Sequence, residues 1–430
     1  MNSANEGAGR RPDARGGSWI RRHPAALVVT LLVLLGWAFG PSALSTPTGA
    51  VPDGAALVVG WRYLLMAPAA NVLDTLSVLT LGQHYAVLAT LILVYVAWRV
   101  FRRRRRLGWL RRVGAELGVA ALSLAGLLAF YGYGAVAPRP MAAIEVADPD
   151  VLVLDVHSHT DHSHDGRAGF DAADNRSWHA GAGFDAVYVS DHRTWQGWLD
   201  AVPANPERAG QGTTLLPALE IAYATKYASA LGEPERYRPA VDGNNLMADS
   251  LYAFWRRGGP RPTLVFTIPE ELDAVPASTA DSIGFVAIEV SDASPKGLRQ
   301  SRRDRALLLR MADSLDLAPV AATNNHGWGR TAAAWTLMPL PGWRELTPTE
   351  LDAAIQDRLH RERRRATRVV ERRSPWLGES AGALAVTVPA ITWQMFGGLG
   401  PAERLVWLGW AWFLAFLVAR RQASAREPAR

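Results

Sequence analysis

The sequence predicts an α/β domain that is joined on both sides to membrane-spanning helices. Apolar residues gather in long blocks at 25–40, 85–101 and 114–135, and again at 381–398 and 404–419. These blocks approach the roughly 20 residues that cross a bilayer. Between them, from 149 to about 341, short apolar runs alternate with helical stretches. This alternation is typical of a parallel sheet that is either doubly wound or closed as a barrel.

The N-terminal part is expected to be a membrane region. We expect a basic cytoplasmic segment at 1–23 and a membrane region at 24–140, with spans at about 25–40, 85–101 and 114–135. The stretch 55–82 contains Arg62, Pro68 and Asp74, so we interpret it as an interfacial segment. Arginines cluster before the first span and again at 102–112. The positive-inside rule places both clusters in the cytoplasm, and the third span then leaves the following domain outside it.

The C-terminal part conflicts with this orientation. We expect a basic helical linker at 346–376, a transmembrane hairpin at 379–421 and a tail at 422–430. Two further spans would leave the basic tail outside, against the charge rule for short segments. Because two separate basic clusters agree at the N-terminal end, we predict a multi-pass membrane protein whose soluble domain, at 149–345, is extracytoplasmic.

The composition excludes sites built from cysteine and argues against nucleic-acid binding. The chain has no cysteine, so disulfides and thiolate metal sites are excluded. Its net charge of +6 comes largely from arginines beside the apolar blocks. Such runs set orientation and attract anionic lipid, so we expect a bilayer as partner and no nucleic acid.

Residues of the metal-binding kind follow four of the predicted strands. The segment "LDVHSHTDHSHDG" (154–166) holds four of the ten histidines in the chain. In parallel α/β folds the chemistry lies at the carboxyl ends of strands, so we expect these residues to converge. The residues at the four strand ends are His157 and His159, Asp191 and His192, Glu220, and Asn324 to His326.

Some of these residues have simpler interpretations. A histidine-rich segment can be a surface tract that binds metal adventitiously, although the further strand ends favour a built site. We expect His162 and His179 to be solvent-facing or on a helix surface rather than ligands. Arg193 is either a phosphate contact, since its planar fork suits phosphate oxygens, or an ordinary surface arginine. Tyr227 is either a phenolate ligand or, as we favour, a core aromatic.

The motifs resemble the PHP (polymerase and histidinol phosphatase) family of metal-dependent phosphoesterases. The resemblance covers roughly 150–335. It consists of the His-x-His-Thr opening at 157–160, Asp165–Gly166, the Ser-Asp-His at 190–192, Glu220 in "ALEIA" and "NNHG" at 324–327. It implies a distorted seven-stranded barrel of the TIM type.

The resemblance also implies a ligand set. One metal site would use His157, His159, Glu220 and Asn324, and the other would use Asp165, His192 and His326, with His164 as an alternative to Asp165. Asp191, Asp165 or a water would handle protons, and Arg193 would contact the phosphate. Imidazole and carboxylate ligands suit Zn, Mn or Fe, and two ions are expected.

The sequence departs from the family pattern at three positions. Tyr227 and Ile268 stand where the family usually has histidines, and Asn324 stands where it has aspartate. A neutral amide in place of a carboxylate should weaken the first site.

Two functions of different class follow. The first is a membrane-anchored, metal-dependent hydrolase of phosphorylated small molecules, in which metal-activated water attacks the ester. The second is a catalytically reduced domain that senses or binds a ligand or a metal. Metal content separates them, because an enzyme should retain about two equivalents.

Overall fold

The computed structural model describes residues 23–101, 109–223, 226–237, 240, 248–267 and 284–424. Its strands are β1 (Leu44–Ser45), β2 (Ala55–Val59), β3 (Ala142–Val146), β4 (Val151–Ser158), β5 (Ala186–Val189), β6 (Thr214–Tyr223), β7 (Lys226–Leu231), β8 (Thr263–Phe266), β9 (Phe285–Asp292), β10 (Ala318–Ala322), β11 (Ala334–Pro339) and β12 (Arg368–Arg372). Its α-helices are α1 (Pro24–Phe39), α2 (Trp61–Leu65), α3 (Ala67–Ser77), α4 (Leu81–Phe101), α5 (Trp109–Val136), α6 (Ala172–Ala182), α7 (Gln196–Ala201), α8 (Pro234–Tyr237), α9 (Ala248–Arg256), α11 (Pro295–Arg303), α12 (Arg305–Ser314), α13 (Pro348–Glu362), α14 (Ala381–Ala385), α15 (Thr387–Gly397) and α16 (Pro401–Ser424).

The α/β unit is built on one curled sheet. The strand order is β1-β12-β11-β4-β5-β6-β7-β8-β9-β10. Strands β4 to β6 are parallel, as are β8 to β10, whereas β7 pairs antiparallel with both of its neighbours. Strands β4, β5, β9 and β10 are buried along their whole length, as expected where both faces of a sheet are covered. The α/β prediction is therefore confirmed.

The curl of the sheet brings its last strand back to β4. The backbone N–H of Asn324, just after β10, donates to the His157 carbonyl at 2.9 Å. The N–H of His159 donates in turn to the Asn325 carbonyl at 2.9 Å. These bonds place the ends of β4 and β10 side by side. The count of seven barrel strands stays a prediction.

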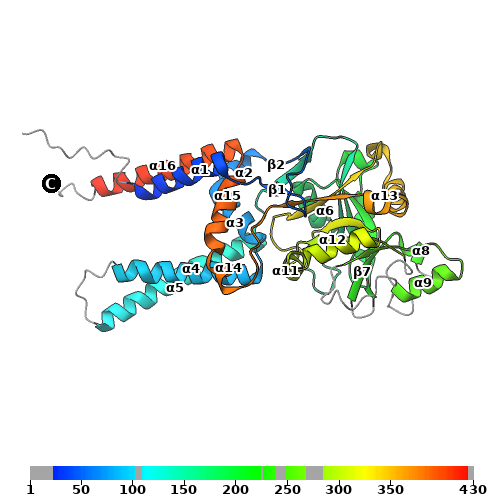
Figure 1. Ribbon diagram of the computed structural model, residues 1–430, viewed down its shortest axis with the longest axis horizontal. Helices are drawn as coiled ribbons and strands as arrows, with labels where there is room; N and C mark the ends of the chain where they lie inside the picture. The colour runs from blue at the N-terminus through cyan, green and yellow to red at the C-terminus, as the bar shows by residue number, and fades with distance from the viewer. Residues whose placement is uncertain are drawn as a thin grey trace, which may run out of the picture.

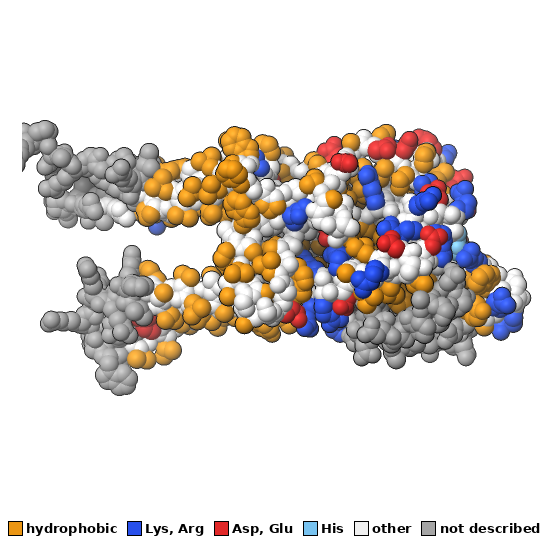
Figure 2. Space-filling view, viewed as in Figure 1, with side chains coloured by type: hydrophobic (Ala, Val, Ile, Leu, Met, Phe, Trp, Pro, Cys, Tyr) orange, Lys and Arg blue, Asp and Glu red, His pale blue; other side chains and the backbone are white. Residues whose placement is uncertain are grey.

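Two pairs of helices extend from the α/β unit on one side (Figure 1). One pair is α1 with α16, and the other is α4 with α5. Segments at Leu81–Arg99, Val113–Val136 and Pro401–Gln422 are long and apolar enough to cross a membrane. Helix α1, where we predicted a span at 25–40, is apolar but has only 16 residues and is shorter than these three. Many of their apolar side chains are exposed, among them Leu93, Leu122 and Leu405, and apolar atoms cover this part of the molecule (Figure 2). Apolar surface of this extent is typical of contact with lipid.

The structure corrects two of the predicted membrane segments. The predicted C-terminal hairpin is wrong in its first arm, because 381–398 forms the short helices α14 and α15, which meet at Val386. Only α16 in that region is long enough to span. The stretch 55–82 is not one interfacial segment either, since it contains β2, α2, α3 and the start of α4, and β2 pairs with β3.

The predicted basic linker at 346–376 is part of the α/β unit. Helix α13 begins with a capping box between Thr347 and Glu350, which satisfies the first free N–H groups of the helix. Its apolar face, with Leu351, Ile355 and Leu359, is buried in the same core as the residues of β4. The last strand, β12, pairs with β11. Basic side chains on the exposed face hid this amphipathic pattern from the sequence interpretation.

This packing predicts how isolated fragments behave. Fragment 149–345 lacks α13 and β12. It therefore exposes the core that Leu351, Ile355 and Leu359 of α13 cover in the whole chain. Each such side chain contributes about 1.5–3 kcal/mol when buried, against a net stability of about 5–15 kcal/mol for a domain. We expect 149–345 to aggregate or to lack cooperative unfolding, and 142–373 to unfold cooperatively. Circular dichroism melts of both fragments test this, and equal stability would contradict it.

Candidate metal centre

The predicted site residues meet at one edge of the curled sheet. His157 lies in β4 and His159 directly after it, His192 follows β5, and Glu220 lies in β6. Because β4, β5 and β6 run parallel, their carboxyl ends share this edge. The loop after β10 adds Asn324 and His326 through its hydrogen bonds to the end of β4.

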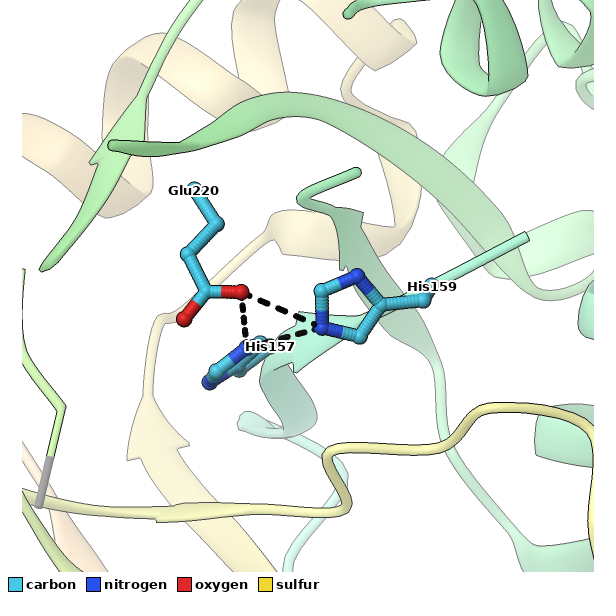
Figure 3. A group of neighbouring side chains, drawn as sticks. All are labelled: His157, His159 and Glu220. Atoms are coloured by element: carbon cyan, nitrogen blue, oxygen red, sulfur yellow. Dashed lines mark hydrogen bonds and ion pairs between the residues drawn. The ribbon is translucent and has the colours of Figure 1, made fainter. Parts of the chain in front are cut away.

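Three side chains converge on one point. The Nε2 atoms of His157 and His159 are 3.0 Å apart, and each lies 3.4 Å from Oε2 of Glu220. Figure 3 shows the two rings and the carboxylate pointing toward one another. All three side chains are buried, and their candidate ligand atoms form a compact group.

The donor set fits a divalent metal. Ligand atoms about 2.1 Å from a tetrahedral ion lie roughly 3.4 Å from one another, and the separations here are 3.0, 3.4 and 3.4 Å. Burial and the nearby His157, His326 and His192 hold the pKa of His159 well below its ordinary value, which favours the neutral ring that a metal ligand needs. Burial also lowers the pKa of His157, but Glu220 and Glu289 outweigh it and raise that pKa well above the usual range. A cation between these groups would replace the proton that His157 holds.

A second group lies beside the first. Oδ2 of Asp165 is 3.5 Å from Nε2 of His192 and 3.2 Å from Nε2 of His326. Oε2 of Glu220 is 3.2 Å from the same His192 atom, so this carboxylate contacts both groups. Gly166 permits the tight turn behind Asp165, because a Cβ there would lie 2.1 Å from the Thr160 carbonyl oxygen.

Asn324 reaches the edge of the first group. Its backbone is left-handed, with φ of 43°, a conformation that asparagine and aspartate tolerate best among non-glycine residues. Its Nδ2 donates to Oδ2 of Asp292 at 3.2 Å, while its buried Oδ1 has no partner among the described residues. The amide therefore bonds a neighbouring carboxylate that an aspartate at this position would repel.

Sequence reasoning missed Glu289 and Asp292. Oε1 of Glu289 accepts from Nδ1 of His157 at 2.8 Å, which fixes the ring with its other nitrogen toward Glu220. Glu289 is fully buried, and burial raises its pKa to about 7. The available signal was a glutamate inside the apolar run "FVAIEV", because a charged residue is rarely placed in a buried strand without a partner.

This contact predicts a graded effect on metal affinity. Glu289→Ala removes the partner of His157 and should weaken metal binding about 10- to 100-fold. Glu289→Gln keeps an oxygen that accepts the same hydrogen bond, so it should recover most of the loss. Competition with a fluorescent chelator measures both variants. Glu371→Ala, which removes the Arg305 ion pair outside the site, is the control, and equal affinities in all four proteins would contradict the assignment.

The structure gives Asp191 and Arg193 other surroundings than those predicted. Both carboxylate oxygens of Asp191 are engaged by Thr160, its N–H at 2.6 Å and its hydroxyl at 2.7 Å. This geometry suits holding the loop that carries His159 rather than transferring protons. Arg193 is exposed, with a left-handed φ of 62°, and is not among the described residues that line the cavity beside the metal groups.

Four other predicted residues are placed as follows. His179 is not solvent-facing but fully buried, and its Nε2 is 2.9 Å from Oδ2 of Asp155. His162 is partly exposed and pairs with Asp200. The ring of His164 packs against that of His192. Tyr227 is not a core residue, because it is 50% exposed and lines the cavity. Ile268 lies outside the described residues.

The cavity beside these groups measures about 810 Å³. His157, Asp165, His192, Glu220 and His326 all reach it. The first turn of α11 faces the same space with Lys296, and Gln300 follows one turn later. A cationic side chain and an amide thus line the same cavity as the histidine and carboxylate groups.

No protein-family profile matches the chain, and no curated protein matches it. Among solved structures, the chain is similar to PsfC from Pseudomonas syringae, with 18% identity and a TM-score of 0.39 over 56% of this chain and 96% of that one. It is also similar to a two-domain protein from Bacteroides vulgatus containing a predicted PHP-like metal-dependent phosphoesterase (15% identity, TM-score 0.34, 50% and 64% of the chains). An amidohydrolase from Chromobacterium violaceum matches with 15% identity and a TM-score of 0.27 over 47% and 96%. Likenesses this weak assign neither an activity nor a family to the chain.

Proposed function

We propose that the chain is a membrane-anchored, metal-dependent phosphoesterase that uses two divalent ions. The observation that carries the proposal is the pair of adjoining ligand groups, which share the Glu220 carboxylate. The first group would comprise His157, His159 and Glu220, with Asn324 beside it. The second would comprise Asp165, His192 and His326. The PHP-type barrel of seven strands belongs to the same proposal.

The reaction is the hydrolysis of a phosphoester. The oxygen of a water molecule forms a bond to phosphorus, the bond from phosphorus to the ester oxygen breaks, and a proton from the water reaches the departing alcohol. Bound divalent ions would lower the pKa of water and neutralise charge on the phosphoryl group. Among the chain's own residues, Lys296 faces the cavity where a phosphate would lie, and Glu289 holds the His157 ring in place.

We further propose that the α/β unit lies outside the cytoplasm. Helices α1 and α16 lie side by side, and so do α4 and α5. The start of α1, the end of α4, the start of α5 and the end of α16 are the helix ends far from the α/β unit (Figure 1). The basic segments at 10–22, 102–112 and 420–430 flank these ends. With α1 and α16 each crossing once, these four helix ends lie on one side of the membrane, and the basic sequence next to them makes that side cytoplasmic by the positive-inside rule. The conflict at the C-terminus came from counting 381–398 as a span.

The proposed orientation has a direct test. Alkaline phosphatase fused after 140 or after 345 should be active, whereas a fluorescent protein fused at the same positions should stay dark if exported unfolded. A fusion after 424 should give the opposite pair of signals, because α16 returns the chain to the cytoplasm. Cytoplasmic signals at 140 and 345 would contradict the orientation.

A catalytically reduced sensor is the second candidate. The neutral amide of Asn324 at the edge of the first group, bonded to Asp292, favours it, because an anionic ligand there would hold a cation more strongly. Elemental analysis of protein purified without added metal, followed by assays of phosphoesters with Mn, Zn and Fe, separates the two. About two equivalents of metal with hydrolysis supports the enzyme. Less than about one equivalent with no hydrolysis supports the sensor.

A further inference from the structure

We propose that the substrate of this site lies in the bilayer: an amphiphile whose phosphate headgroup is held at the membrane surface. The proposal rests on the proposed function and adds where the substrate comes from. Two walls of the cavity are fixed directly to the ends of the candidate spans α4 and α5. These attachments place the cavity beside the point where those helices leave the apolar layer.

The first wall is the loop after β10. His326 and Trp328 on this loop line the cavity. The next residue, Gly329, donates its N–H to the Ala135 carbonyl in the last turn of α5 at 2.7 Å. Two residues further on, Thr331 bonds Nη2 of Arg139 at 2.6 Å. The loop that carries a candidate ligand is thus tied to the end of α5 by backbone and side chain.

The second wall is α11. Lys296 and Gln300 line the cavity from this helix. At its other end, Nη2 of Arg302 donates to the Val78 carbonyl at 2.7 Å and Nη1 to Oε1 of Gln83 at 3.4 Å. Gln83 lies in the first turn of α4. The start of α4 and the end of α5 are the same end of this helix pair (Figure 1), so both walls stand on one edge of the membrane part.

The rim of the cavity has the composition of a bilayer interface. Trp328 is 57% exposed and Tyr227 is 50% exposed. Amphipathic rings of this kind are enriched where lipid headgroups lie, and a cation such as Lys296 can pair with a phosphate headgroup. Apolar side chains cover the helices up to the α/β unit (Figure 2). A lipid could therefore place its phosphate in the cavity while its acyl chains stay against the helices.

Position at the bilayer is tested with the full chain in vesicles. The sequence has no cysteine, so Trp328→Cys provides a single attachment point for a fluorophore. Arg361→Cys is the matched control, because its side chain is 70% exposed and α13 lies at the end of the α/β unit away from the membrane helices (Figure 1). Lipids with a nitroxide headgroup should quench the probe at 328 at least about threefold more than at 361, since only the former lies at headgroup depth. Equal quenching overturns the proposal.

Substrate class is tested with matched pairs of esters. Phosphatidic acid in vesicles is compared with glycerol 3-phosphate, and phosphatidylglycerol with glycerophosphoglycerol. The lipid of at least one pair should be hydrolysed at least about tenfold faster than its soluble counterpart, because the membrane concentrates it at the mouth. Equal or faster hydrolysis of the soluble esters overturns the lipid substrate and leaves the phosphoesterase standing. If protein that holds metal hydrolyses none of the four esters, both the phosphoesterase and the lipid substrate are overturned.

Discussion

Replacement of both His157 and His159 by alanine is expected to abolish metal binding at the first group and hydrolysis with it. Their Nε2 atoms, 3.0 Å apart, supply two of the three convergent ligand atoms, and Glu220 alone cannot hold an ion against water. Metal content should fall from about two equivalents to about one or less. Elemental analysis and a phosphoester assay on the purified variant measure both effects.

The control for this variant is His162→Ala. His162 belongs to the same sequence cluster, but it is partly exposed and pairs with Asp200 at the surface, where an ion pair contributes about 0–1 kcal/mol. Metal content and activity should remain those of the wild type. If the double variant retained the metal content of the wild type, the histidines would not be ligands and the proposed centre would be wrong.

Asp74→Ala is expected to destabilise the whole chain strongly. The Asp74 carboxylate is buried between the apolar helices and the α/β unit, where it pairs with Arg139 at 2.6 Å and Arg372 at 3.3 Å. Tyr63 and Thr331 also donate to it. Removing one partner of a buried ion pair costs about 3–5 kcal/mol, because the other charges stay buried without compensation.

Thermal unfolding of the full chain in detergent measures the loss. A cost of this size should lower the midpoint by on the order of 10 °C. Asp53→Ala is the matched control, since Asp53 is exposed and surface changes are usually small. An unchanged midpoint in Asp74→Ala would show that the junction contributes little. Because Thr331 follows the loop of His326, the variant should also weaken metal binding, which the chelator competition described for Glu289 detects.

The candidate ligands were within reach of sequence reasoning because strand ends constrain them locally. His157, His159, His192 and Glu220 each follow or end a short apolar run, and parallel strands bring such ends together. The residues that surround and hold these ligands could not be predicted in this way. Glu289 and Asp292 come from β9, and their contacts to His157 and Asn324 join residues far apart in the chain. No local period or spacing encodes such a contact.

The apolar helices show the same contrast between what local sequence predicts and what it does not. Apolar composition correctly located α4, α5 and α16, since the length and hydropathy of a helix are local properties. The break between α14 and α15 also had a local signal, because Pro389 has no N–H to donate to the carbonyl of Ala385, and interpreting 381–398 as one span overlooked it. The basic run at 358–374 was ambiguous, because a helix with one apolar stripe and a strand at a sheet edge both carry many exposed arginines.

Short-range patterns of hydrophobic and metal-binding residues were therefore enough to predict the α/β class, the apolar helices and the candidate ligands. The tertiary structure alone decided that Asp191 holds Thr160, that α13 and β12 complete the α/β unit, and that the cavity stands at the ends of α4 and α5. These features depend on buried hydrogen bonds and ion pairs between distant segments, whose favourable energy exists only once burial has removed the competing water.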